Sequence, residues 1–124
     1  MSARTAIVIA TLVTAAAGKA LADGDAAAGR ALAEYQCARC HVVSESSGMG
    51  IESTPSFRLL VGLPDWKARF QTFYARRPHI PFVLVRGRAP RPDVPANIVP
   101  FEIEPEDIEN LIAFAGTIAA EASE

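Results

Sequence analysis

Apolar side chains recur at helical spacing in three stretches of the chain, which predict helices over residues 25–40, 65–76 and 105–120. The first stretch is rich in alanine, a strong helix former, and an aspartate that can cap the helix, Asp23 or Asp25, stands at its start. No comparable alternation of apolar and polar residues predicts a sheet. The pattern therefore indicates a small all-α fold.

The second and third predicted helices each present one apolar face. In the second helix this face is aromatic, with positions i, i+4, i+7 and i+8 filled by Trp66, Phe70, Phe73 and Tyr74. In the third helix the apolar stripe consists of Ile108, Leu111, Ile112 and Ala115. Pro105 suits the first turn of the third helix, so we expect the helix to begin there.

Two long loops separate the helices. Residues 42–55 are rich in serine and glycine, and residues 78–100 contain six prolines. Proline fixes the backbone and removes an amide donor, so regular structure is improbable in the second loop, except for a short extended piece over residues 82–85. A loop of this length in a small domain usually wraps a bound group.

Residues 1–22 have the features of a secretory signal peptide. Arg4 supplies the positive start, residues 5–17 form an apolar run, and Ala20-Leu21-Ala22 fits a cleavage site. The run is short for a membrane anchor, and Lys19 follows it closely. We therefore expect export to the periplasm, cleavage, a single domain over residues 23–124, and no transmembrane anchor after cleavage.

The two cysteines of the chain lie in the stretch Cys37-Ala38-Arg39-Cys40-His41. Two thiols at this spacing can add to the two vinyl groups of one haem, and the histidine that follows can reach the iron. A disulfide is the main alternative in an exported protein. A zinc site usually needs four ligands, and the other histidine, His79, is distant in the sequence. A thioredoxin-like motif would need a βαβ pattern, so haem attachment is favoured.

The formal net charge of −2 conceals an uneven distribution of charge. Residues 58–91 hold seven arginines and one lysine against one acid, whereas residues 93–124 hold eight acids and no base. The basic segment is a solvated surface, a docking face for a partner, or a source of arginines that neutralise haem propionates. Nucleic-acid binding does not fit an exported, slightly acidic chain.

Over residues 28–117 the chain resembles a monohaem class I cytochrome c. The resemblance is carried by a helix that runs into CARCH, by Thr54-Pro55, and by the closing helix PEDIENLIAF. It implies crossing N- and C-terminal helices, with the middle helix and the proline-rich loop wrapped around one covalent haem c. It also implies that Gly29 lies at the crossing, against Leu111 and Phe114.

The resemblance implies several roles at the haem. His41 would be the proximal iron ligand, and the carbonyl of Pro55 would accept a hydrogen bond from its Nδ1 atom. Trp66 and Tyr74 would line the haem, hydrogen-bond a propionate, or pack in the core. The family's second iron ligand is a methionine ahead of the last helix, but Val99, or Ile98 in a shifted alignment, stands in that place here.

Several groups remain candidates for the sixth iron ligand. His79 is the leading one, because imidazole binds iron well and two nearby prolines, Pro78 and Pro81, would hold it in place. Met49 is the methionine that remains after cleavage. A weak ligand such as Asn97 or Lys67, or an open or water-bound iron, completes the set.

The sequence thus predicts a periplasmic electron carrier that exchanges electrons with redox partner proteins. It predicts no enzyme, because Ser44, Ser46 and Ser47 have no nearby histidine partner except the haem-bound one. One alternative is a protein that binds or senses O2, NO or CO at an open sixth position. Another is a haem subunit of a larger periplasmic oxidoreductase.

Overall fold

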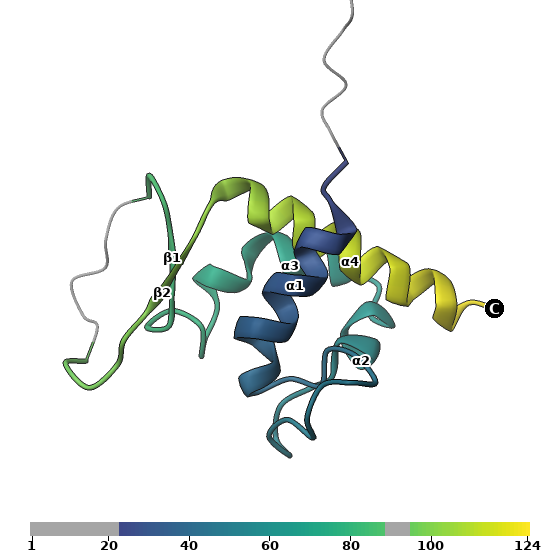
Figure 1. Ribbon diagram of the computed structural model, residues 1–124, viewed down its shortest axis with the longest axis horizontal. Helices are drawn as coiled ribbons and strands as arrows, with labels where there is room; N and C mark the ends of the chain where they lie inside the picture. Colours follow the sequence, from purple (N-terminus) through teal and green to yellow (C-terminus); the bar gives the residue numbers. More distant parts are fainter. Residues whose placement is uncertain (1–22, 89–94) are drawn as a thin grey trace, which may run out of the picture.

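The computed structural model describes residues 23–88 and 95–124, so the predicted signal peptide over residues 1–22 lies outside the described part. The fold is mainly helical, with a small two-stranded sheet beside the helices (Figure 1). The helices are α1 (Ala26–Gln36), α2 (Phe57–Val61), α3 (Trp66–Thr72) and α4 (Pro105–Ala122). Two 3-10 turns, η1 (Cys37–Arg39) and η2 (Phe73–Ala75), follow α1 and α3, and the strands are β1 (Val83–Val85) and β2 (Phe101–Ile103).

The three predicted helices are present, with changed ends. Asp25 caps α1 because its side chain accepts hydrogen bonds from the amides of Ala27 and Ala28. The first helix stops at Gln36, before the predicted residue 40, and the chain tightens into η1. The second predicted helix is likewise divided into α3 and η2, whereas α4 extends two residues beyond the predicted end.

Helices α1 and α4 cross in close contact (Figure 1), as the resemblance implied. Gly29 lies at the crossing, where a Cβ atom would overlap the carbonyl oxygen of Asn110. A side chain at position 29 would therefore force the two backbones apart. The side chain of Asn110 also accepts a hydrogen bond from the amide of Asp25 at 2.8 Å, which fixes the start of α1 against α4.

The core has two connected parts. The larger one joins the crossing helices to α2 and α3, with buried side chains Ala33, Val43, Phe57, Val61, Phe70, Leu111, Phe114 and Ala115. The smaller one lies between the sheet and the start of α4, with Val83, Val85, Ile103 and Ile108. Leu32, Phe73 and Ile112 pack against both parts, so the sheet is attached to the helices by apolar contacts.

The prediction of an all-α fold is wrong in one respect, because β1 and β2 form a parallel pair with Val83 opposite Phe101 and Val85 opposite Ile103. The extended piece expected over residues 82–85 corresponds to β1, but β2 was not expected. Each strand has three residues, too few for a periodic pattern, and the proline-rich stretch between them obscures the pairing. Helix α2 was also missed; it has five residues and is capped by Ser56, whose side chain accepts from the amide of Leu59.

Within residues 23–88 and 95–124, no helix is long and apolar enough to cross a membrane.

The close crossing predicts that Gly29→Ala destabilises the protein although alanine favours helices. We expect the overlap with the Asn110 backbone to lower the free energy of unfolding by about 1–3 kcal/mol. Urea denaturation followed by circular dichroism measures this change. The matched control is Gly116→Ala in α4, where a Cβ would meet only Trp66 at 3.9 Å. It should stabilise the protein by up to about 1 kcal/mol. Equal effects of the two substitutions would contradict the close crossing.

Candidate cofactor-binding site

A cavity of about 790 Å³ lies where η1, the loop before α2, α3 and the start of the sheet converge. This volume is within the range of small-molecule and cofactor sites, about 300–1,000 Å³. The five site residues named from the sequence, which are far apart in the chain, all line it: Cys37, Cys40, His41, Pro55 and His79. The fold thus brings the predicted attachment motif and the second histidine to one site.

The two thiols of the motif sit at the end of α1 in different environments. The amide of His41 donates to the carbonyl of Cys37 at 2.9 Å, so the motif forms a compact turn in which both cysteines border the cavity. Cys37 is partly buried and Cys40 is exposed. Burial, with a smaller contribution from Cys40, raises the pKa of the Cys37 thiol to about 12. Both cysteines are free thiols, so the disulfide alternative is not formed in this structure.

The ring of His41 is oriented by a hydrogen bond to the loop that precedes α2. Its Nδ1 atom lies 2.6 Å from the carbonyl oxygen of Pro55. A carbonyl oxygen can only accept, so Nδ1 carries the proton and Nε2 keeps its lone pair for a metal. The ring of Phe57 packs against the imidazole edge at a centroid distance of 5.6 Å. The contact with Pro55 is the one that the resemblance implied.

The loop that carries Pro55 folds back over the cysteine motif. The amide of Ile51 donates to the carbonyl of Cys40 at 2.8 Å, and the amide of Phe57 donates to the carbonyl of Val42 at 2.9 Å. Gly50 permits this return because its φ is +66°, in the left-handed region that favours glycine. A Cβ at position 50 would also lie 2.8 Å from the Cys40 carbonyl oxygen. The position of Pro55 relative to His41 thus depends on this turn.

His79 is held by a backbone turn that follows η2 and lines the cavity together with the motif. Its amide donates to the carbonyl of Arg76, and its own carbonyl accepts from the amides of Phe82 and Val83. Burial, followed by the proximity of His41, holds the pKa of the His79 imidazole below its ordinary value, against a smaller opposite effect of the nearby carbonyls of Arg76 and Phe73. At neutral pH the ring is therefore uncharged and has a lone pair to offer.

The imidazole rings of His41 and His79 lie close together and almost parallel. The centres of the His41 and His79 rings are 5.9 Å apart, and their planes are parallel within 9°. A metal-bound imidazole nitrogen lies ~2 Å from the metal and ~1 Å from the centre of its ring, so two imidazoles on opposite sides of one ion have centres about 6 Å apart. The observed distance between the ring centres is therefore compatible with two imidazoles that share one ion between them.

The donor set limits which metal group fits between these rings. Among the described residues, no group of three or more histidine, cysteine or acidic side chains is arranged to hold a metal ion. Two imidazoles alone do not complete a tetrahedral zinc site. They do complete the coordination of an iron whose other four ligands come from a porphyrin. The residues present therefore fit a haem better than a bare ion.

Of the remaining candidates for the sixth ligand, Met49 and Lys67 do not line the cavity, whereas Asn97 does. Met49 is 95% exposed and does not border the cavity. Val99, the residue in the place of the family methionine, borders the cavity but is 89% exposed. Asn97 and Ile98 also line the cavity. Lys67 lies over the ring of Trp66, with its Nζ atom 5.5 Å from the ring centre.

Trp66 and Tyr74 are not among the residues that line the cavity. Trp66 packs edge-on against Phe70, with ring centres 6.0 Å apart. Tyr74 packs against Phe73 and lies under the guanidinium of Arg88 at 4.6 Å. Of the roles open to these residues, packing is the one that the structure supports.

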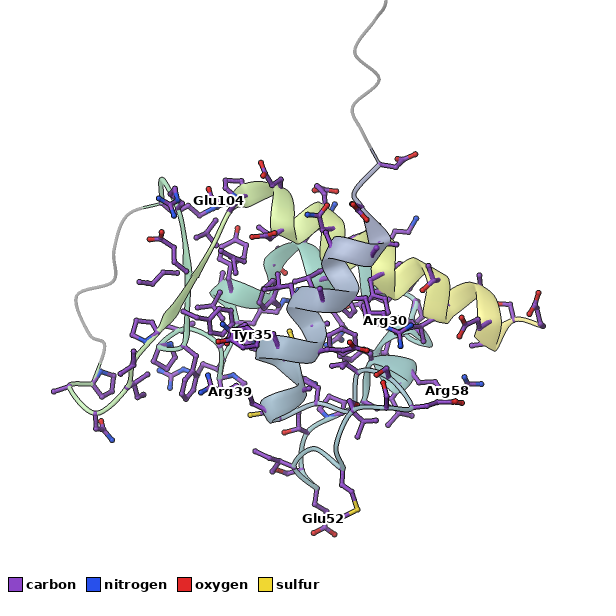
Figure 2. All side chains as sticks on the ribbon, viewed as in Figure 1. Arg30, Tyr35, Arg39, Glu52, Arg58 and Glu104 are labelled. Carbon is purple, nitrogen blue, oxygen red and sulfur yellow. The ribbon has the colours of Figure 1, made fainter. Side chains whose placement is uncertain are left out.

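Some of the described arginines of the basic segment lie at the cavity, and another lies beside the sheet. Three of the segment's arginines, Arg69, Arg76 and Arg77, line the cavity together with Arg39, the last residue of η1 (Figure 2). Arg69 also pairs with Asp65 at 2.8 Å. Arg86 instead pairs with Glu102 and Glu104 beside the sheet. The sequence showed the excess of arginine but not this division, which depends on the fold of residues distant in the chain.

Two aromatic contacts of the site were not predicted from the sequence. Phe57 packs on His41, and Phe73 meets the His79 ring edge-on at 5.4 Å. Phe73 was part of the aromatic face of the second predicted helix, which gave a signal for burial but none for contact with a histidine. Phe57 gave no signal, because α2 is too short to show a pattern.

Comparison with models of protein families, with curated protein sequences and with solved structures finds no match to this chain.

The turn at Gly50 predicts a specific cost for Gly50→Ala. We expect the positive φ and the contact with the Cys40 carbonyl to lower the free energy of unfolding by about 2 kcal/mol or more. Gly87→Ala is the matched control, because Gly87 also has a positive φ of 77° but open space around a Cβ. It should cost only the backbone strain of about 1 kcal/mol. Urea denaturation of both variants measures the difference, and an equal cost would show that the contact is unimportant.

Proposed function

We propose that this chain is an exported c-type cytochrome, which carries one covalent haem c and transfers single electrons between redox partner proteins in the periplasm. Cys37 and Cys40 attach the haem, and His41 and His79 are the axial iron ligands. The observation that carries the proposal is the pair of parallel imidazoles, whose ring centres are 5.9 Å apart. They line one cavity together with the two thiols of CARCH. The mainly helical fold and the crossing of α1 and α4 support a class I cytochrome c fold.

Different residues around the site have different roles in holding the haem. Each thiol adds across one vinyl group and forms a thioether, so the attachment does not depend on iron ligation. The Pro55 carbonyl fixes the tautomer of His41, which leaves the lone pair of Nε2 for the iron. When bound, the haem supplies one-electron chemistry; the protein supplies orientation, burial and the electrostatic surroundings.

The choice of His79 has a consequence for the reduction potential. A methionine ligand raises the potential of a c-type haem relative to a second histidine. Because Val99 occupies the methionine position and His79 faces His41, we expect a potential below that of the His/Met members of the family. The proximity of His79 to His41 does not favour an open sixth position.

The four arginines that line the cavity suit the anionic groups of a haem. A guanidinium forms two parallel hydrogen bonds with a carboxylate, which makes arginine an effective partner for a propionate. Arg39, Arg76 and Arg77 have exposed side chains at the cavity, so they can take this role without burying an unpaired charge. The same positive border would favour an acidic partner surface during electron exchange.

Covalent attachment is tested by replacing both thiols. Cys37→Ser with Cys40→Ser should abolish haem that survives denaturation, because serine does not add to the vinyl groups. Haem staining after denaturing electrophoresis and mass spectrometry of the exported protein measure the attachment. Haem that remains bound to the double variant under these conditions would refute the attachment site.

Axial ligation is tested by His79→Ala, with Met49→Ala as the matched control. The ferric wild type should be low-spin with two nitrogen ligands, and His79→Ala should convert it largely to a high-spin form. Met49→Ala should leave the spectrum unchanged, since Met49 lies outside the cavity. Electron paramagnetic resonance and absorption spectra measure both. If the spectrum of His79→Ala equals that of the wild type, His79 is not the ligand.

A further inference from the structure

The imidazoles of His41 and His79 differ in the hydrogen bonding of their Nδ1 atoms. The Nδ1 atom of His41 donates to the Pro55 carbonyl at 2.6 Å. The Nδ1 atom of His79 is buried, and among the described residues the carbonyls of Arg76 and Phe73 lie near its ring without forming a hydrogen bond of regular geometry with that atom. A hydrogen bond at this atom raises the basicity of a ligating imidazole and fixes its ring, and its loss typically weakens metal binding about 10- to 100-fold. His79 is therefore the weaker of the two ligands.

The surroundings of His79 also favour release of its imidazole from the iron while its backbone stays in place. The ring is only partly buried, and its aromatic contact beyond His41 is the edge-on ring of Phe73. The backbone of His79 is fixed by its bonds to Arg76, Phe82 and Val83. A released ring would thus swing about its own side-chain bonds and return, without any change in the fold. No buried hydrogen bond would be broken at its Nδ1 atom.

The residues next to His79 limit the kind of ligand that could replace it. Phe73 meets the His79 ring, and the amides of Phe82 and Val83 donate to the His79 carbonyl; all three have apolar side chains and line the same cavity. They offer no hydrogen bond to a bound anion or to a charged oxygen species. Phe82 is 44% exposed, so this apolar side of the cavity reaches the surface. Arg76, Arg77 and Asn97 border other parts of the same cavity lining, so the apolar surroundings are those of the three side chains alone, and these suit a small neutral diatomic on ferrous iron.

We propose that carbon monoxide or nitric oxide binds the ferrous haem of this protein by displacing His79, so that the carrier also responds to neutral diatomic gases. This rests on the proposed function, because it requires a haem between His41 and His79. The bond from His79 Nε2 to the iron breaks, the gas takes its place, and His41 stays bound. No electron is gained or lost in the exchange, and His79 leaves as a neutral imidazole.

The test uses the haem-loaded full chain, reduced and mixed with carbon monoxide in a stopped-flow instrument. We expect the wild type to form a carbon monoxide complex at a rate that reaches a plateau as the gas concentration rises, because dissociation of His79 becomes limiting. His79→Ala should bind without a plateau and about 10- to 1,000-fold more tightly, since its site is always competent. Met49→Ala should behave as the wild type does.

The outcomes separate the gas-binding proposal from the electron-transfer proposal. A low-spin wild type with covalent haem that forms no complex under saturating carbon monoxide overturns the displacement of His79 and leaves electron transfer standing. Equal affinity and no plateau in both proteins also overturn it, because His79 would then not be a ligand. Absence of covalent haem in the wild type overturns both proposals. If His79→Ala fails to load haem, the wild type alone tests the proposal. A plateau in its rate of carbon monoxide binding supports displacement of His79, and the absence of a plateau overturns it.

Discussion

The crossing of α1 and α4 is the constraint on which the site depends. The absence of a side chain at Gly29 lets the two backbones meet at Asn110, and the hydrogen bond from Asp25 fixes the start of α1. Because the cysteine motif follows α1 directly, the position of the thiols and of His41 is set by this contact. Leu111, on α4 just beyond the crossing, is buried in the core and also lines the cavity, so the crossing forms part of its wall.

The second half of the site is built from segments with little regular structure. Pro55, His79 and the residues around Val99 come from loops, and each loop is tied to a regular element by a few backbone hydrogen bonds. The role of the sheet here is to position the segment that carries His79. Strand β1 begins four residues after His79 and pairs with β2, which leads into α4. The segment with His79 is thereby joined to α4 through the sheet, and His41 is positioned against the same helix through α1.

Much of the helical framework could be predicted from the sequence, because helices of this length carry a strong periodic signal. The crossing at Gly29 followed from a resemblance and is present in the structure. The short elements α2 and β2 could not be predicted, since five or three residues give no period. The cysteine spacing indicated a covalent haem, yet it could not show which residue faces His41. The pairing of His41 with His79 depends on tertiary contacts between distant segments, and the local sequence of one segment does not predict its contact with the other.

The parallel setting of the two imidazoles has a consequence for the speed of electron exchange. The orientation of the His41 ring depends on the Pro55 carbonyl, and the backbone that carries His79 is held by its own turn. Neither of these restraints changes with the charge on an iron between the rings. A site arranged in advance in this way needs little reorganisation when charge changes. In the proposed cytochrome, the small nuclear rearrangement between the ferric and ferrous forms would keep the activation barrier for electron transfer low.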